Sequence, residues 1–183
     1  IRNLGFSYHG DVSCFDYLLE HHDKYKWDFV QIQMNYIDWE NAEGDANADY
    51  LYEELEKRNS PVVIMEPLRG GALAKLNHKI LEMFQRANPD VSAASWAFRY
   101  AGTPKGILTV LSGMTYMEHL QDNIRTYSPL EPLNEEEYKM INRAAELILN
   151  FPLIGCTSCQ YCMPCPYGLD IPGIFSHYNK SIN

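Results

Sequence analysis

The sequence predicts an α/β fold, in which a parallel sheet is flanked by helices. Strand-like and helix-like stretches alternate along the chain, and this alternation is typical of strands that run parallel to one another. Two of the strand-like stretches, 61–65 (PVVIM) and 107–111 (ILTVL), are apolar on both faces. Such stretches are expected of strands that helices bury from both sides.

The predicted elements follow one another in a regular order. Strands are expected, the last two of them buried, at 3–6, 29–33, 61–65 and 107–111. Helices are expected at 12–22, 50–58, 80–86, 92–100, 117–125 and 134–150. The segment NYIDWENAEGDANA (35–48) is polar and is expected to be a loop.

Two of the helices begin with capping-box spacing, in which the side chains of the first turn satisfy free backbone N–H groups. Thr115 with Glu118 has this spacing, and so has Asn134 with Glu137. These pairs predict where the last two helices of the alternating region start.

The strands and helices form four β/α units, and two architectures are compatible with them. A closed barrel needs eight units in about 250 residues. The chain of 183 residues is therefore either a small open α/β sheet or half of a barrel, and periodicity alone does not decide.

Composition excludes two classes of partner. The formal net charge is −9, and an acidic surface repels phosphate backbones, so nucleic-acid binding is not expected. No apolar stretch approaches the roughly 20 residues that span a bilayer.

Cys14 stands alone and the other cysteines are too crowded for a disulfide framework, which favours a cytoplasmic protein. Because the sequence opens with Ile1 in a strand-like stretch, we expect that its beginning is missing.

Polar residues and glycines follow each predicted strand, where ligand chemistry is located in parallel α/β proteins. They are Ser7–His9, Gln31–Tyr36, Glu66–Gly71 and Ser112–Met114. Amides, hydroxyls and glycines suit the amide and phosphate groups of a cofactor, although loops are commonly polar for other reasons. The glycine pair at 70–71 is a weaker signal than a dinucleotide fingerprint, because no GxGxxG is present.

Four stretches together give the chain a family resemblance. GFSYH, WDFVQIQMNY, PVVIMEPLRGGALA and LTVLSGMTYMEHLQDNI resemble, in order and spacing, the C-terminal half of an aldo/keto reductase of the subgroup with an iron–sulfur tail. The resemblance implies half of a (β/α)8 TIM barrel that binds NADP or NAD and interconverts carbonyl compounds and alcohols.

The resemblance also implies cofactor-binding residues, position by position. Ser7 and Gln31 match the residues that contact the nicotinamide carboxamide, and Met65 stands where an aromatic residue usually stacks on the nicotinamide ring. Leu68 belongs to the loop that covers the pyrophosphate. The residues that match the adenosine end are Ser112, Gly113, Met114 and Asn123, with Asp122 in the adjacent acidic position.

The chain departs from the family pattern in informative ways. Tyr8 replaces the asparagine that usually follows the serine, and no basic residue near Gly113 is placed to select a 2′-phosphate. NADP and NAD therefore both remain open. The family's catalytic Asp, Tyr, Lys and His precede the matching region, so we name no catalytic residue in this chain.

Four cysteines lie within ten positions near the end of the chain. Cys156, Cys159, Cys162 and Cys165 form C-x2-C-x2-C-x2-C-P, close to the C-x2-C-x2-C-x3-C-P pattern of bacterial ferredoxins. The spacing predicts a ferredoxin-like segment with a 4Fe–4S cluster, whether or not all four cysteines bind it. A zinc site is the alternative, and disulfides are disfavoured because such short loops strain the S–S geometry. We expect Ile174 and Phe175 to pack over the cluster.

We expect three regions: a half barrel at 1–133, a connecting helix at 134–151 and a cluster segment at 152–183. One hypothesis is the C-terminal part of a reductase, and the other is a non-catalytic electron-transfer or assembly module. Unpaired strand edges invite pairing with another chain. We therefore expect a homodimer or association with the missing barrel half.

Overall fold

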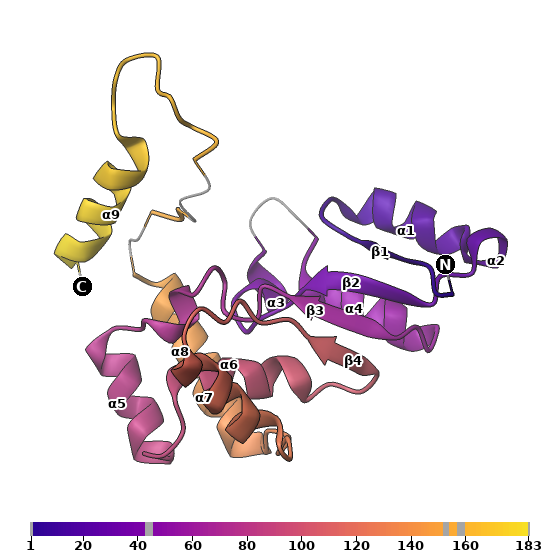
Figure 1. The fold of residues 1–183 in the computed structure, drawn as a ribbon, viewed down its shortest axis with the longest axis horizontal. Coiled ribbons are helices and arrows are strands. Elements are labelled where there is room, and N and C mark those ends of the chain that lie inside the picture. Colours follow the sequence, from indigo (N-terminus) through magenta and orange to yellow (C-terminus); the bar gives the residue numbers. More distant parts are fainter. Residues whose placement is uncertain (1, 43–45, 152–153, 157–159, 183) are drawn as a thin grey trace. The chain divides into compact units, whose positions relative to one another are not determined.

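The structure, a computed structural model, describes residues 2–42, 46–151, 154–156 and 160–182. The chain divides into two compact units, 1–145 and 146–183. The first unit contains the parallel sheet and the helices around it (Figure 1), and the second contains the cysteine-rich segment. The predicted boundaries at 133 and 151 stay predictions.

The sheet has four parallel strands in the order of the sequence. They are β1 (Gly5–Ser7), β2 (Phe29–Gln33), β3 (Val62–Met65) and β4 (Ile107–Val110). The prediction for β2 is confirmed residue by residue, and the other strands lie within two residues of their expected bounds. An open doubly wound sheet reverses its strand order partway. The uninterrupted order instead corresponds to a segment of a barrel.

Short connections and helices join the strands. The helices of the alternating region are α1 (Val12–Glu20), α2 (His22–Tyr25), α3 (Asp38–Asn41), α4 (Ala48–Lys57), α5 (His78–Ala87), α6 (Ala93–Gly102), α7 (Met117–Tyr127) and α8 (Glu135–Leu149), with a 3₁₀ turn, η1, at Ala72–Ala74. Two expectations are wrong in detail. The helix expected at 12–22 ends at Glu20, and the segment expected to be a loop contains α3.

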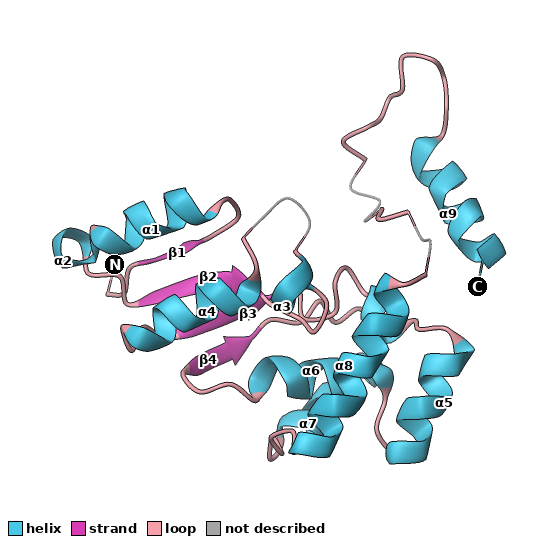
Figure 2. Cartoon of the chain, turned by 180° about the vertical axis from the view of Figure 1, so that it is seen from behind, coloured by secondary structure: helices cyan, strands magenta, loops and turns pink. Residues whose placement is uncertain are grey.

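The two faces of the sheet have different characters. Val30 and Ile32 of β2 belong to the buried core on one face, where α1 and α4 cover the sheet (Figure 2). Alternate residues of a strand point to opposite faces, so Gln31 and Gln33 point to the other face. That face carries the polar residues of the candidate site.

Strand β4 is not buried as expected. Leu108 is 63% exposed, and Thr109 is exposed as well. The physical reason is that β4 lies at an edge of the sheet, with β3 its single partner strand among the described residues. The apolar sequence of β4 predicted a buried strand, but no described element covers its free edge.

One of the two capping boxes is confirmed. The Asn134 Oδ1 atom accepts from the Glu137 backbone N–H (3.0 Å), and the Glu137 Oε2 atom accepts from the Asn134 N–H (2.9 Å). The box at Thr115 is wrong, although α7 begins at Met117 as expected: its N-cap is Tyr116, and no side chain forms a capping hydrogen bond.

The second unit contains one further helix, α9 (Ile171–Ile182). Asp170 precedes it and accepts from the Gly173 N–H at 3.1 Å. The Asn179 amide forms hydrogen bonds in both directions with the backbone of Ile154, at 2.8 and 2.9 Å. This pairing ties the segment before the first cysteine of the run to α9. None of the described helices is both long and apolar enough to cross a membrane.

Candidate functional site

Three side chains from three neighbouring strands meet at the carboxyl end of the sheet. The Gln31 Nε2 atom donates to Ser7 Oγ and to Met65 Sδ, both at 3.2 Å. The Ser7 hydroxyl also lies 3.7 Å from Met65 Sδ. Parallel pairing produces this convergence, because Ser7 lies opposite Gln31 in the register. The structure thus brings together the residues predicted for the nicotinamide end.

The group combines neutral polar atoms with an apolar surface. Ser7 is exposed, Gln31 is half-buried and Met65 is 9% exposed. A hydroxyl and an amide can hold an amide ligand, while the methionine side chain offers a soft apolar contact. No group in the trio carries a charge that would perform acid–base chemistry.

Tyr8 follows Ser7 but points away from this group. Its ring packs against Phe15 with ring centroids 4.9 Å apart, and its hydroxyl donates to the Asp11 carbonyl. Burial, followed by the charge of Cys14, raises the pKa of Tyr8 to about 12. Tyr8 is therefore a neutral core residue and does not take the place of the family's asparagine in the site.

A second predicted pair meets at the end of β4. The Asn123 Nδ2 atom of α7 donates to Ser112 Oγ at 2.9 Å. Gly113 and Met114 follow Ser112 and are exposed, Met114 at 47%. The residues predicted for the adenosine end thus lie on one loop and on the helix that follows it.

A polar pocket lies between α5, the turn before α6, and α7. The Asp122 carboxylate at its wall accepts from Ser92 Oγ at 2.5 Å and from Arg125 at 3.3 Å. Leu81 and Phe84 provide its apolar side. The pocket therefore offers both hydrogen-bonding groups and an apolar surface.

The loop after β3 has an unusual backbone. Glu66, Arg69, Gly70 and Gly71 all have positive φ, with Gly71 at 90°. The loop turns back on itself, because the Leu68 carbonyl accepts from the N–H groups of Gly71 and Leu73. Leu68, predicted to cover a pyrophosphate, is half-buried within this turn.

A buried polar network lies beside this loop, and the sequence analysis did not predict it. Asp38 is 2% exposed and accepts hydrogen bonds from Gln33 (2.6 Å) and Asn35 (2.7 Å). Arg69 Nε lies 3.3 Å from Asp38 Oδ1. The sequence did contain a signal for this network. Gln31, Gln33 and Asn35 are followed by Asp38, which lies in the stretch predicted to be a loop.

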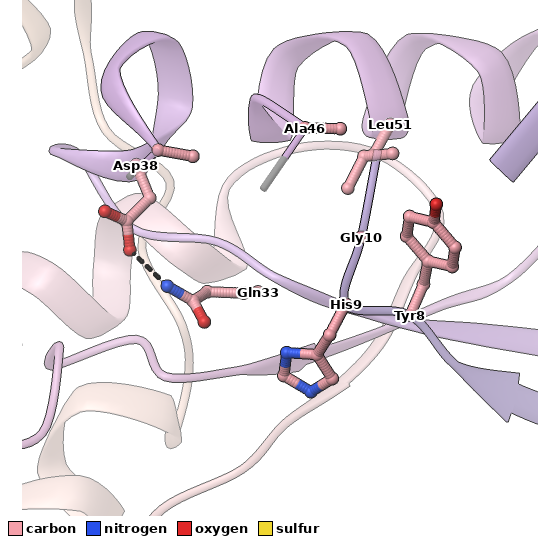
Figure 3. A pocket seen from close by; sticks show the side chains of 8 residues that line it. Tyr8, His9, Gly10, Gln33, Asp38, Ala46 and Leu51 are labelled. Atoms are coloured by element: carbon pink, nitrogen blue, oxygen red, sulfur yellow. Dashed lines mark hydrogen bonds between the residues drawn. The ribbon is translucent and has the colours of Figure 1, made fainter. Parts of the chain in front are cut away.

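A small pocket adjoins Asp38 on the side of β1. Figure 3 shows Gln33 and Asp38 joined by their hydrogen bond, with Tyr8, His9 and Gly10 of the loop after β1 nearby. Ala46 and Leu51 close the pocket on the side of α4. Its lining is mostly apolar, and its size limits it to a very small occupant.

The cysteine run is described in part. Cys156 and Cys162 are exposed free thiols, Cys165 is a half-buried free thiol, and Cys159 lies outside the described residues. Among the described residues, no group of three or more His, Cys, Asp or Glu side chains is placed to hold a metal ion. Ile174 is 50% exposed. The predicted cluster and its zinc alternative therefore stay predictions.

Comparison with known proteins gives a consistent result for the first unit. The model of the aldo/keto reductase family matches residues 1–146. No curated protein sequence matches the chain. Among solved structures, the chain is similar to an aldo-keto reductase from Klebsiella pneumoniae in complex with NADPH, with 18% identity and a TM-score of 0.60. It is also similar to an aldo-keto reductase from Bacillus halodurans in its holo form, with 17% identity and a TM-score of 0.58.

The chain spans about half the length of these solved structures. The alignments cover 79% and 78% of this chain but 48% and 50% of the two reductases. At these identities the likeness concerns the fold.

Proposed function

The chain belongs to the aldo/keto reductase family, and we propose that it forms the nicotinamide-binding part of an oxidoreductase that interconverts carbonyl compounds and alcohols. The observation that carries this proposal is the convergence of Ser7, Gln31 and Met65 at the carboxyl end of the sheet. This is where parallel barrel proteins place their ligands.

The residues present fit a nicotinamide group. When bound, a nicotinamide cofactor supplies a hydride to the carbonyl carbon or removes one from the alcohol. The Ser7 hydroxyl and the Gln31 amide hold the carboxamide by hydrogen bonds, and Met65 covers an apolar ring face. These residues bind and orient the ring and exclude water from it, and none of them transfers a proton.

The opposite end of the cofactor fits the β4–α7 region. We assign Ser112, Gly113 and Met114 to the phosphate of the adenosine half, and Asn123 to the adenine. The polar pocket beside Asp122 is a place for the adenine edge. The Klebsiella relative was solved with NADPH, which supports NADP. Positions 107–118 of the sequence, which include Gly113, contain no lysine or arginine, so NAD is also compatible.

The acid–base residues of the reaction belong to another part of the complete enzyme in this proposal. The chain aligns with about half of each solved relative, and the family's tetrad of Asp, Tyr, Lys and His has no match among its residues. The partner that completes the site is the other half of the barrel. A second copy of this chain is the alternative partner for the sheet edges.

We also propose that Cys156, Cys159, Cys162 and Cys165 hold a 4Fe–4S cluster in a reducing, cytoplasmic environment. The support is their spacing, followed by Pro166, together with the free thiols of the three described cysteines. This cysteine run also favours a second candidate function, an electron-transfer module without carbonyl chemistry.

The reductase proposal is tested with the full natural protein, purified without oxygen, by following the consumption of NADPH or NADH with simple aldehydes. Ser7→Ala removes one hydrogen-bonding group and is expected to raise the KM for the cofactor about fivefold. Ser60→Ala is the matched control, because Ser60 precedes β3 at the opposite end of the sheet, and its KM should not change. A cofactor KM that is equal in both variants would contradict the assignment of Ser7.

The cluster proposal is tested by metal and sulfide analysis of the same preparation. Iron and acid-labile sulfide in equal amounts, with an electron paramagnetic resonance signal on reduction, are the expected result. Zinc without sulfide would show that the cysteines hold a zinc ion and not an iron–sulfur cluster. A reducible cluster without nucleotide binding would favour the electron-transfer module.

A further inference from the structure

We propose that Asp38 is a positioning residue, which holds the loop 66–71 in its cofactor-binding conformation through Asn35 and Arg69. The inference rests on the proposed function, because this loop contains Leu68. It assigns a role to a buried acid that neither the family resemblance nor the site trio requires.

The Asp38 carboxylate is buried and has three side-chain partners. Asp38 lies at the start of α3, is 2% exposed and accepts hydrogen bonds from two side-chain amides. A carboxylate is costly to bury without such partners. Gln33 and Asn35 supply two donors, and the third contact is to the guanidinium of Arg69, which belongs to a different loop.

Asn35 connects Asp38 to the backbone of that loop. The Asn35 Nδ2 atom donates both to Asp38 and, at 3.0 Å, to the Glu66 carbonyl. Its Oδ1 atom accepts from the N–H groups of Ile37 and Asp38. All the hydrogen-bonding capacity of this fully buried amide is used, so it fastens the start of the loop to the end of β2.

The loop contains two backbone positions in an unfavourable conformation. Glu66 (φ 54°) and Arg69 (φ 47°) are left-handed although neither is glycine, and this conformation brings the Cβ atom of such a residue too close to the neighbouring backbone. Asn35 holds the carbonyl of Glu66, and Asp38 holds the side chain of Arg69. The two attachments therefore act on the two strained non-glycine positions of the loop.

Asp38 is not one of the residues proposed to contact the nicotinamide. Its carboxylate sits on the wall of the small pocket near β1 (Figure 3), whereas the residues proposed to contact the nicotinamide are Ser7, Gln31 and Met65. Asp38 is therefore expected to change cofactor affinity through the loop and to leave the rate of the chemical step unchanged.

The test compares Asp38→Asn, Arg69→Gln and the double variant in the full natural protein. We expect each single variant to raise the cofactor KM about tenfold with kcat retained. We expect the effects of the two substitutions in the double variant to be less than additive, because both remove the contact between Asp38 and Arg69. Arg69 is 26% exposed, so Arg69→Gln is expected to fold even if Asp38→Asn does not. Arg58→Gln, which removes a partly exposed ion pair with Glu54 in α4, is the control and should leave the KM unchanged.

Amide hydrogen exchange without cofactor separates this inference from the proposed function. Exchange at the Gly70 and Gly71 N–H groups is expected to become faster in Asp38→Asn and Arg69→Gln but not in Arg58→Gln. Unchanged exchange in the loop, or additive effects of the two substitutions on KM, would overturn the positioning role. If exchange is faster in these variants but the protein binds no nucleotide, the proposed function is rejected, whereas the attachment of the loop by Asp38 is still supported.

Discussion

Met65 is the residue at which this chain departs most clearly from the expected nicotinamide site. A flat aromatic ring would stack on the nicotinamide, whereas a methionine provides a flexible apolar surface and a weak sulfur acceptor. In the structure this sulfur lies within reach of both Ser7 and Gln31. The trio is therefore linked before any ligand binds.

The role of Met65 is tested by two substitutions. Met65→Leu keeps nearly the same volume and is expected to bind NADPH within about twofold of the wild type. Met65→Ala removes the apolar cover and leaves a cavity, so binding is expected to weaken about tenfold. Fluorescence titration measures both dissociation constants. Equal affinity of the two variants would show that the methionine does not cover the ring.

At the same scale, the family resemblance of the sequence pointed to Ser7 and Gln31 as cofactor-binding residues. The structure places them opposite each other in the register of β1 and β2, and their roles stay predictions. Asp38 could not be predicted, because its partner Arg69 lies 31 positions away and the burial of both depends on the packing of two loops. Tertiary contacts of this kind leave no periodic signal in a sequence.

Helices α6 and α8 are joined by a partly buried ion pair that also takes part in a helix cap. Arg99 donates two hydrogen bonds of 2.8 Å to the Glu137 carboxylate, and the same carboxylate closes the capping box of α8 with Asn134. Burial alone would raise the pKa of Glu137, but these hydrogen bonds outweigh it and hold the pKa below its ordinary value of 4.5.

The pH dependence of this pair has a definite sign. A carboxyl group whose pKa is lowered by folding stabilises the folded state above its unfolded pKa, and the contribution is lost as the pH falls through the folded pKa. Glu137→Gln is therefore expected to lower the free energy of unfolding by about 1–3 kcal/mol at neutral pH. The difference from the wild type should shrink below pH 4.5.

Denaturant unfolding over a range of pH measures this effect. Glu135→Gln is the matched control in the same helical turn, since Glu135 is 85% exposed and pairs with Lys139 on the surface. It should change the unfolding free energy little. A Glu137→Gln difference that stayed constant down to acid pH would show that charge is not the cause.

Element boundaries were predictable where the signal was local. The capping box at Asn134 located the start of α8, because both of its partners lie within one turn of helix. The same spacing at Thr115 was misleading, since Tyr116 rather than Thr115 is the N-cap of α7. The apolar pattern of β4 located the strand correctly but not its burial, which depends on a neighbour that the described sheet lacks.

The first unit as a whole leaves apolar side chains at both edges of its sheet. Leu4 precedes β1 and is 43% exposed, and Leu108 of β4 is 63% exposed. Met117 and Ile124 of the following helix are also more than half exposed. Edges of this kind pair readily with other chains, which agrees with the proposal that a further set of β/α elements completes this unit.

Association of the chain is therefore expected when it is expressed without a complementary half. Light scattering over a range of concentrations should show dimers or larger species. Leu108→Lys places a charge on the β4 edge and should shift them toward the monomer. Tyr17→Lys, at a residue of α1 that is 60% exposed, is the control and should not. A wild-type chain that stays a monodisperse monomer would contradict this expectation.

The fold class could be predicted from the alternation of strands and helices, but the choice between an open sheet and a barrel segment could not. That choice depends on strand order, which is a property of the assembled sheet. The sequential order of the strands and the family match over 1–146 now favour the barrel.

The most direct test of the central claim is a titration of NADPH and NADH into the full natural protein, followed by fluorescence. We expect saturable binding of at least one of the two cofactors. Gln31→Leu should weaken it about fivefold through the loss of the amide hydrogen bonds, and Ser60→Ala should leave it unchanged. Absence of saturable binding for both cofactors, or binding that Gln31→Leu leaves unaltered, would contradict this claim.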